Sequence, residues 1–449
     1  MDWQEEYTKK LVSADEAVKI IKSGDRVHLP TIYHPQVLVN ALARRKDELK
    51  GVRLIVGPSD LDFSWYEPGI EDSILIQNEQ VPLPQQRMLA EEKRADHIYY
   101  RLHGSYFKVQ QERRGEVPEA EVDVVMVKVS PPDKNGYCSF GLNPWQKKTA
   151  CKLAEKTIAL VDDSLHRLYL RDNFIHVSEI DYFVDEPSPR PVARRAMKAP
   201  EPSEEIKRIG ENAASLIRDG DCIQIGWGPT TQTLAEIIFE KEPREDLGVH
   251  TELVYPGVVW AVQKGVITGK HKTLHPGKVV SNSLTVMGEE ELAFIEDNPT
   301  FEFYSMEYVC DLRVIAANDN MVAINSALSV DLTGQINVES FGTLQYSGIG
   351  GQLEFAIGAM LSRGGRNITI LESTARDGIF SRIVATFSEG TAVSIPRAYA
   401  DYIVTEYGIA RLLGKSARER ARELIAIAHP NFREELKGQA EELLGGVYG

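Results

Sequence analysis

An internal similarity constrains the fold of this 449-residue chain more than any other feature of its sequence. Residues 17–27 (AVKIIKSGDRV) align with residues 213–223 (AASLIRDGDCI), and Gln36–Leu38 then aligns with Gln232–Leu234. With one residue of slippage, the segment that begins at Gly51 corresponds to the segment that begins at Gly248. The sequence therefore predicts two halves of similar construction.

Each half is expected to open with an amphipathic helix that ends at a Gly-Asp turn, followed by a short apolar strand, a loop, a second helix and another strand. Because strands that alternate with helices form parallel sheets, this order predicts an α/β fold: two related open α/β domains with mostly parallel sheets. Six further apolar runs are expected to continue the scheme as strands: Val122–Val129, Thr157–Val161, Val279–Ser281, Leu312–Ala316, Asn367–Leu371 and Tyr402–Thr405.

A proline-rich segment separates the two halves. Five prolines between residues 185 and 203 disfavour a helix or an interior strand, so this stretch is expected to be an extended linker. The predicted domains are residues 1–184 and 204–449, and the second carries the candidate nucleophile described below. Residues 416–444 predict two helices separated by Pro430, which pack on the second domain.

Composition excludes several classes of protein. The net charge of −15, from 51 basic and 66 acidic residues, disfavours binding to nucleic acid or to an anionic membrane surface. No run approaches 18 apolar residues, and the N-terminal segment has the acidic character that secretory signals lack. The four cysteines are widely spaced, and the ten histidines form no HExxH motif. We expect a cytoplasmic protein with reduced thiols, no metal, and no nucleic-acid or membrane partner.

Glu252 is the candidate nucleophile, because it ends the apolar run Gly248–Leu253 at the position where open parallel sheets bind ligands. A carboxylate can attack an acyl thioester to give a mixed anhydride and a thiolate, and the thiolate can then form a glutamyl thioester. The intermediate conserves the thioester's energy, so exchange needs no ATP. A solvent-facing carboxylate at a strand end is the structural alternative.

Two glycine-containing segments are candidate binding loops. Gly348, Gly350 and Gly351 let the backbone approach a substrate closely, and N–H groups near Gly350 and Gly351 are the expected oxyanion donors. A second loop follows the predicted strand Cys222–Ile225 and opens a helix near Thr231, an arrangement that suits an anion or pantetheine. This loop consists of Gly226, Trp227, Gly228, Pro229 and Thr230. Each segment can instead be an ordinary structural bend.

Two polar residues in apolar surroundings are candidates for orienting Glu252. Asn325 lies within the apolar run 322–327, and a buried amide needs a hydrogen-bond partner. It is expected to hold the Glu252 carboxylate, or else to be a satisfied amide of the core. His250 shares a strand face with Glu252 by period-two alternation, from which it can tune the carboxylate's pKa.

Taken together, several ordered motifs resemble the acetyl-CoA hydrolase/transferase family, and within it the 4-hydroxybutyrate and butyrate CoA-transferases. The similarity extends over nearly the whole chain. Its motifs are Ser130–Gly141 (SPPDKNGYCSFG), Phe174–Tyr182, Gly248–Leu253, Asp331–Gln335, Gly348–Phe355 and Val404–Ala410.

The resemblance implies a class I CoA-transferase architecture with the active site between the domains. It implies ping-pong exchange through a glutamyl-CoA thioester on Glu252, with acyl-CoA and carboxylate substrates, no separate cofactor, and a homo-oligomeric state. It also implies that the loop from Gly226 and the turn from Gly348 contact CoA and the oxyanion. Tyr33, Trp227 and Tyr255 depart from the family pattern and are expected to reshape the acyl pocket.

Three functions follow from these observations. The leading hypothesis is a CoA-transferase for short-chain acyl groups such as acetate, butyrate or 4-hydroxybutyrate. An acyl-CoA hydrolase would use the same site, with water as the acceptor. A non-catalytic CoA-binding protein is the third alternative, and the presence of Glu252 beside a glycine turn argues against it.

Overall fold

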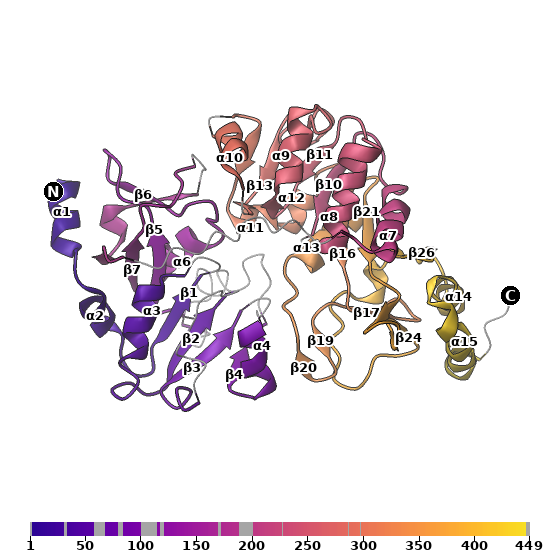
Figure 1. The fold of residues 1–449 in the computed structure, drawn as a ribbon, viewed down its shortest axis with the longest axis horizontal. Coiled ribbons are helices and arrows are strands. Elements are labelled where there is room, and N and C mark those ends of the chain that lie inside the picture. Colours follow the sequence, from indigo (N-terminus) through magenta and orange to yellow (C-terminus); the bar gives the residue numbers. More distant parts are fainter. Residues whose placement is uncertain are drawn as a thin grey trace.

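The computed structural model describes residues 2–30, 34–57, 68–79, 84–99, 115–116, 121–168, 172–187, 201–226, 228–285, 287–296 and 298–445. Over these residues the two halves of the chain form two α/β units that lie side by side (Figure 1). Each unit is built around its own sheet, and the sheets are mostly parallel. The predicted fold class is therefore confirmed.

The first unit contains a sheet of seven parallel strands. Its order is β4 (Ala95–His97), β3 (Ile74–Asn78), β2 (Val52–Val56), β1 (Arg26–Leu29), β5 (Val124–Val129), β7 (Lys156–Val161) and β9 (Tyr182–Val184). The other elements are α1 (Trp3–Lys10), α2 (Ala14–Ala17), η1 (Val18–Ile20), α3 (Gln36–Ala43), α4 (Pro84–Glu91), α6 (Lys147–Leu153), η4 (Val177–Glu179) and the antiparallel pair β6 (Tyr137–Ser139) and β8 (Phe174–His176).

The second unit contains a sheet of eight strands, in which only the last pair is antiparallel. Its order is β15 (Phe301–Phe303), β13 (Val279–Ser281), β11 (Gly248–His250), β10 (Cys222–Ile225), β16 (Met321–Ser326), β21 (Arg366–Ile370), β25 (Tyr402–Thr405) and β26 (Gly408–Arg411). Its helices are α7 (Glu204–Ala214), α8 (Pro229–Glu236), η5 (Ile237–Lys241), α9 (Pro256–Gln263), α10 (Glu289–Ile295), α11 (Met306–Val309), α12 (Leu312–Ala316), α13 (Gln352–Leu361), η6 (Arg397–Tyr399), α14 (Ala417–Ile427) and α15 (Pro430–Leu444).

The second unit also contains short strands that lie outside its main sheet. They are β12 (Leu253–Val254) with β14 (Ser283–Leu284), β17 (Ser329–Asp331) with β18 (Ile336–Asn337) and β24 (Ile383–Val384), β19 (Ser340–Phe341) with β20 (Leu344–Gln345), and β22 (Thr374–Ala375) with β23 (Phe380–Ser381).

The internal similarity corresponds to a shared topology. Taken in chain order within each unit, the strands follow the same spatial order, 4-3-2-1-5-6-7, and the second sheet adds one more strand. The turns before β1 and β10 also match. Gly24 and Gly220 both have positive φ, and the aspartate after each glycine accepts a 2.7 Å hydrogen bond from the backbone N–H three residues before it. Two copies of one local turn thus start two copies of one sheet.

The central strands are buried on both faces, as expected of the interior strands of a parallel sheet. Every residue of β5, β10 and β21 is buried. β5 is an almost continuous apolar run that hydrophobicity alone predicts, whereas β10 and β21 also contain buried polar residues such as Gln224, Arg366 and Asn367.

One predicted strand is wrong. Leu312–Ala316 forms the helix α12 rather than a strand. Asp311 caps this helix by accepting a hydrogen bond from the backbone N–H of Arg313 at 2.8 Å. A five-residue apolar run has too few residues to reveal its period, so the cap decided the conformation.

The loop before α6 joins the two units. Trp145 packs beside Cys222, Cys310 and Phe355 of the second unit. Backbone contacts reinforce this packing, because Leu284 N donates to Leu142 O at 2.9 Å and Asn282 Nδ2 donates to Trp145 O at 3.2 Å. The first unit is therefore anchored beside the carboxyl ends of the second sheet.

The two C-terminal helices lie at the end of the molecule farthest from the first unit (Figure 1). Leu424, Ile427 and Ala428 are buried against the second unit, and Pro430 is the first residue of α15, as the sequence predicted. Residues 188–200 of the predicted linker lie outside the described residues, and the predicted domain boundaries stay predictions.

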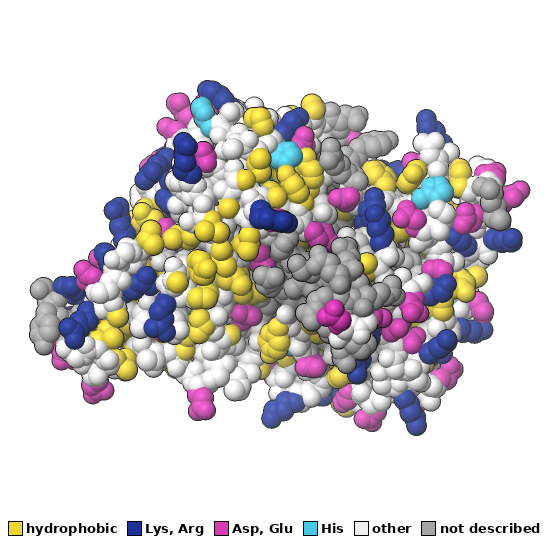
Figure 2. All heavy atoms as spheres, turned by 180° about the vertical axis from the view of Figure 1, so that it is seen from behind, with side chains coloured by type: hydrophobic (Ala, Val, Ile, Leu, Met, Phe, Trp, Pro, Cys, Tyr) yellow, Lys and Arg dark blue, Asp and Glu magenta, His cyan; other side chains and the backbone are white. Residues whose placement is uncertain are grey.

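The face drawn in Figure 2 carries basic and acidic side chains that are intermixed, together with a continuous group of apolar side chains. All four cysteines are free and buried, as expected from their spacing. Among the described residues, no helix combines the length and the hydrophobicity needed to cross a bilayer.

Candidate active site

Glu252 lies just beyond β11, at the carboxyl edge of the second sheet. Its backbone is held firmly: its carbonyl accepts hydrogen bonds from Ser283 N at 3.0 Å and from Ser281 Oγ at 3.0 Å. The preceding residue, Thr251, donates its N–H to Val280 O at 3.0 Å. Bonds to the neighbouring strand β13 and its exit thus fix where the Glu252 side chain begins.

The carboxylate of Glu252 meets the turn that the sequence singled out. It accepts a hydrogen bond from the backbone N–H of Gly351, and a Cβ on Gly351 would stand 2.8 Å from Glu252 Cδ. Only glycine allows this approach, since real Cβ atoms do not come so close to another carbon. The structure therefore brings together two residues that are almost a hundred positions apart in the chain.

Gly351 is also the N-cap of α13. A helix N-terminus presents unpaired N–H groups and a partial positive charge, so it stabilises a nearby negative charge. An N–H already directed at the Glu252 carboxyl is well positioned to hold the oxygen of an adduct on Glu252. This is the arrangement expected of an oxyanion donor.

The Glu252 carboxyl is strongly perturbed. Burial is the main cause and the nearby charge of Glu354 adds to it, so the pKa of Glu252 rises from 4.5 to about 7, although the Gly351 N–H acts in the opposite direction. The side chain is still partly open to solvent. A desolvated carboxylate with a raised pKa is more nucleophilic than one in bulk water.

Glu354 is a residue that the sequence reasoning missed. It lies in the first turn of α13, three residues after Gly351, and is only 1% exposed. The signal was available in the motif Gly348–Phe355, since an acid shortly after a helix-capping glycine lies near the helix N-terminus. Its proximity to Glu252, however, depends on the packing of α13 against the second sheet.

The turn itself is stabilised from both sides. Gly350 has φ +59°, a conformation that favours glycine, and both Tyr346 N and Ser347 N donate to Glu339 O, at 2.7 and 2.8 Å. From the first unit, Arg87 of α4 donates to Tyr346 O at 3.2 Å and stacks 3.9 Å above the Tyr346 ring. The position of the turn therefore depends on both units.

The second glycine loop lies at the same edge of the sheet, between β10 and α8. Gly226 N donates to Ile324 O at 2.8 Å, Gly228 is the N-cap of α8, and Pro229 and Thr230 begin the helix. Trp227 lies outside the described residues. Because β10 is the neighbour of β11, this loop and Glu252 follow the carboxyl ends of adjacent strands.

Asn325 has a partner other than the one predicted. Its Nδ2 donates to Gln224 Oε1 at 2.9 Å, and its Oδ1 accepts from Gln224 Nε2 at 3.1 Å. Asn325 also lies close to Gly226, where a Cβ would stand 2.6 Å from Asn325 Oδ1. The prediction that Asn325 holds the Glu252 carboxylate is thus not supported, because the alternative of a satisfied buried amide describes these contacts.

His250 belongs to the core. Its Nε2 lies 2.8 Å from Val309 O, and burial lowers the pKa of His250 to about 3, so it is neutral. Burial, Glu354 and Gly351 account for the perturbation of Glu252 without it. Tyr255, expected in the acyl pocket, packs within the hydrophobic core of the second unit, and Tyr33 lies outside the described residues.

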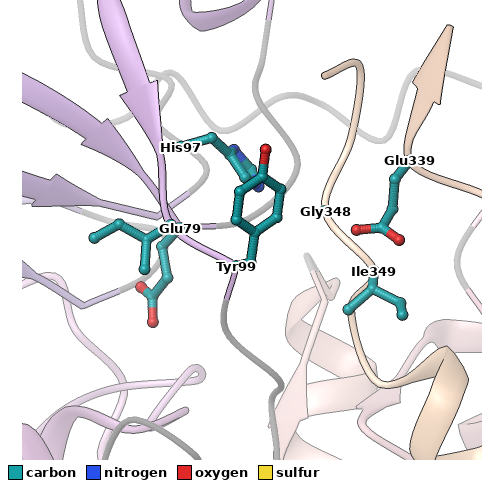
Figure 3. Close-up of a pocket in the computed structure, with 7 residues that line it drawn as sticks. Glu79, His97, Tyr99, Glu339, Gly348 and Ile349 are labelled. Carbon is teal, nitrogen blue, oxygen red and sulfur yellow. The ribbon is translucent and has the colours of Figure 1, made fainter. Parts of the chain in front are cut away.

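A cavity of about 190 Å³ lies between the units, next to the turn that begins at Gly348. Figure 3 shows Tyr99 and His97 on the wall formed by the first unit, and Glu339, Gly348 and Ile349 on the opposite wall. Of the described residues, Glu79 and Ile98 also line the cavity. Glu252 does not line this cavity; the turn that carries Gly348 connects the two. Within the described ranges, no cluster of His, Cys, Asp and Glu is suited to hold a metal ion.

Comparison with known proteins identifies relatives of this chain. It is 41% identical to the 4-hydroxybutyrate coenzyme A transferase of Clostridium kluyveri, over 98% of the chain and 99% of that protein. It is 35% identical to the succinyl-CoA:cyclohexane-1-carboxylate CoA transferase of Geobacter metallireducens, covering 98% and 97%. With the butyryl-CoA:acetate CoA-transferase of Anaerostipes caccae the identity is 33%, covering 98% of each.

Solved structures show the same fold. RipA from Yersinia pestis superposes with a TM-score of 0.86 at 31% identity, over 99% of both chains. The 4-hydroxybutyrate CoA-transferase from Porphyromonas gingivalis has a TM-score of 0.76 at 32% identity, over 99% of this chain and 100% of that one.

Family models agree with these similarities. The acetyl-CoA hydrolase/transferase N-terminal domain matches residues 1–193, and the C-terminal domain of the same family matches residues 288–440. The resemblance inferred from the motifs is confirmed, and the chain belongs to the acetyl-CoA hydrolase/transferase family of enzymes.

Proposed function

We propose that this enzyme transfers CoA between a short-chain acyl-CoA and a carboxylate through a covalent intermediate on Glu252. The single observation that carries the proposal is the contact between the Glu252 carboxyl and the Gly351 N–H at the N-terminus of α13. It combines a nucleophile with a donor for the oxyanion that forms when the nucleophile reacts.

In the first half-reaction, a Glu252 carboxylate oxygen attacks the thioester carbonyl carbon, the C–S bond breaks, and CoA leaves as a thiolate. The thiolate then attacks Glu252 Cδ of the mixed anhydride and releases the first carboxylate, which leaves a glutamyl-CoA thioester. In each tetrahedral adduct at Cδ, the Gly351 N–H stabilises the negative oxygen. The second half-reaction reverses these steps with a new carboxylate.

The pantetheine and phosphate groups of CoA need a donor surface near Glu252. The loop Gly226–Thr230 fits this requirement, because it follows β10, the strand next to β11, and leads into the N-terminus of α8. CoA is a substrate in this proposal, and no other cofactor takes part. The acids that the relatives' names give support a short carboxylic acid such as 4-hydroxybutyrate, butyrate or acetate as the acceptor.

Trapping the intermediate tests the proposal. Incubation with acyl-CoA followed by borohydride is expected to reduce a glutamyl thioester at Glu252 to an alcohol, detectable as a mass change in the peptide that contains it. Glu252→Ala provides the matched control and is expected to show no modification. A wild-type peptide of unchanged mass would indicate a non-catalytic CoA-binding protein instead.

Acyl-CoA hydrolysis is the second candidate, favoured by the partial solvent exposure of Glu252, which lets water reach the intermediate. Acyl-CoA loss with and without added carboxylate separates the two activities. A transferase shows little turnover until the acceptor is present, whereas a hydrolase is indifferent to it.

We also propose that the enzyme is a homo-oligomer. Large apolar side chains that remain exposed in the single chain support this, among them Phe341 at 54% and Ile379 at 66%. Light scattering coupled to size-exclusion chromatography measures the mass, and a monomer at micromolar concentration would contradict the proposal.

A further inference from the structure

The cavity between the units is lined by acidic groups. Of the described residues that line it, Glu79 and Glu339 are acids, and the other titratable side chains are those of His97 and Tyr99. Burial lowers the pKa of His97 to about 4, so this imidazole brings no positive charge. Among the described residues that line the cavity, none is a lysine or an arginine.

The two acids on the wall have different partners. His28 lies beside Glu79, with its Nε2 3.3 Å from Glu79 Oε2. Glu339 accepts a 2.6 Å hydrogen bond from the neutral hydroxyl of Ser394. The Arg87 guanidinium contacts the ring and the carbonyl of Tyr346 and keeps its charge, but it is not among the residues that line the cavity. Within the described part of the chain, no lysine or arginine forms a salt bridge with Glu339, which bonds instead to the Ser394 hydroxyl.

The cavity lies within reach of the reacting carboxyl. Gly348 lines it, and Gly351, three residues later, donates to Glu252. Three residues span at most about 11 Å, so this wall lies within that distance of the N–H group that bonds to Glu252. The volume of about 190 Å³ is far more than one water molecule needs.

We infer that this cavity receives the distal end of the carboxylic acid substrate, and that Glu339, assisted by Glu79, excludes acids with a second negative charge. The inference rests on the proposed transferase function. The site is assigned to short monocarboxylates whose far end is neutral or donates a hydrogen bond to a carboxylate, and dicarboxylates are disfavoured. A second carboxylate held about 5 Å from Glu339 would weaken binding by roughly a hundredfold at a surface-like dielectric.

Succinate and its monomethyl ester provide the test, because both acids have the same carbon skeleton and only one has a second charge. In the wild-type enzyme, kcat/KM for succinate as acceptor is expected to be at least about tenfold below that for monomethyl succinate. This comparison requires no variant and so does not depend on any variant's folding. Equal values for the two acids would overturn the inference.

Glu339→Gln then tests the assigned residue. Glutamine keeps the acceptor for Ser394 and removes only the charge, so the ratio of kcat/KM for succinate to that for the ester is expected to rise about fivefold or more. Glu389→Gln, which removes one charge from an exposed position of the same unit, is the matched control and should leave the ratio unchanged.

A ratio that stays the same in Glu339→Gln, or that rises equally in the Glu389 control, would refute the role of Glu339. Failure of the underlying function has a different signature: no carboxylate would support exchange, and borohydride would trap nothing on Glu252.

Discussion

The carboxyl group of Glu252 is bonded to the backbone N–H of Gly351, at a distance that leaves no room for a side chain on residue 351. The carboxyl group follows the end of β11, and its hydrogen-bond donor lies at the start of α13. Neither element contains both groups, so the candidate active site exists only where the strand end and the helix start meet.

Gly351→Ala tests this contact. The residue has φ −91°, which alanine accepts without strain, but the new Cβ would collide with the Glu252 carboxyl. We expect kcat to fall roughly a hundredfold, since displacement by about 1 Å can cost that much, while Tm changes little. Gly350→Ala is the control: its Cβ would enter open space, and only the positive φ opposes it, at about 1 kcal/mol. A larger loss of kcat in the Gly350 variant would contradict this interpretation.

Glu252→Gln is expected to lower the exchange rate at least about a thousandfold, because an amide is a poor nucleophile. Glutamine has nearly the same size as glutamate, so the packing should be kept. Circular dichroism and the melting temperature establish that the variant is folded. Residual exchange near the wild-type rate would show that another residue accepts CoA.

The pH dependence of exchange should follow Glu252. Only the ionised carboxyl attacks, and its pKa is about 7, so the rate is expected to rise with pH through neutrality. Glu354→Gln removes the neighbouring charge that raises this pKa, and the midpoint of the rate profile should move to lower pH. A profile that is unchanged by the substitution would exclude electrostatic coupling between the two carboxyls.

Stability should change over the same pH range, with a defined sign. Because the folded pKa of Glu252 lies above its unfolded value of 4.5, the stabilisation that it contributes is complete below about 4.5 and is lost as the pH rises through about 7. Glu252→Gln is therefore expected to gain in Tm relative to the wild type between pH 6 and pH 8. Paired thermal melts across this range measure the difference, and a constant difference would contradict it.

Arg87→Ala is expected to lower kcat roughly tenfold or more, since Arg87 fixes Tyr346 at the start of the turn that leads to Gly351. Arg87→Lys keeps the charge but loses the planar guanidinium that both stacks on the Tyr346 ring and bonds to its carbonyl. The lysine variant should therefore recover little of the lost kcat. Added guanidinium is expected to rescue the alanine variant in part. Rescue by lysine alone would indicate that charge, rather than positioning, is what matters.

A buried ion pair in the first unit should contribute strongly to folding. Lys128 Nζ lies 3.0 Å from Asp162 Oδ2, and the two side chains are 3% and 8% exposed. Lys128→Met leaves a buried carboxylate without its cation and is expected to destabilise the protein by about 3–5 kcal/mol. Lys156→Ala breaks the more exposed pair with Asp181 and should cost only about 0–1 kcal/mol. Denaturant unfolding compares the two variants.

Local signals explain which predictions succeeded. The Gly-Asp turns at Gly24 and Gly220 and the apolar strands that follow them depend on neighbouring residues, so the α/β fold and its repeat could be predicted from the sequence. The identity of Glu252 as a candidate came from its place at a strand end. The run Leu312–Ala316 was misassigned because five apolar residues fit a helix and a strand equally well.

The sequence by itself thus determined the two related α/β units, the family, and the two segments that hold Glu252 and Gly351. Only the tertiary structure decided that Asn325 pairs with Gln224, that Glu354 lies beside Glu252, and that Glu79 and Glu339 line one cavity. The physical reason is the sequence distance over which each interaction acts. Backbone turns and hydrophobic periods are set by residues close in the chain. These side-chain partners come from different strands, helices and units, which meet only when the chain packs.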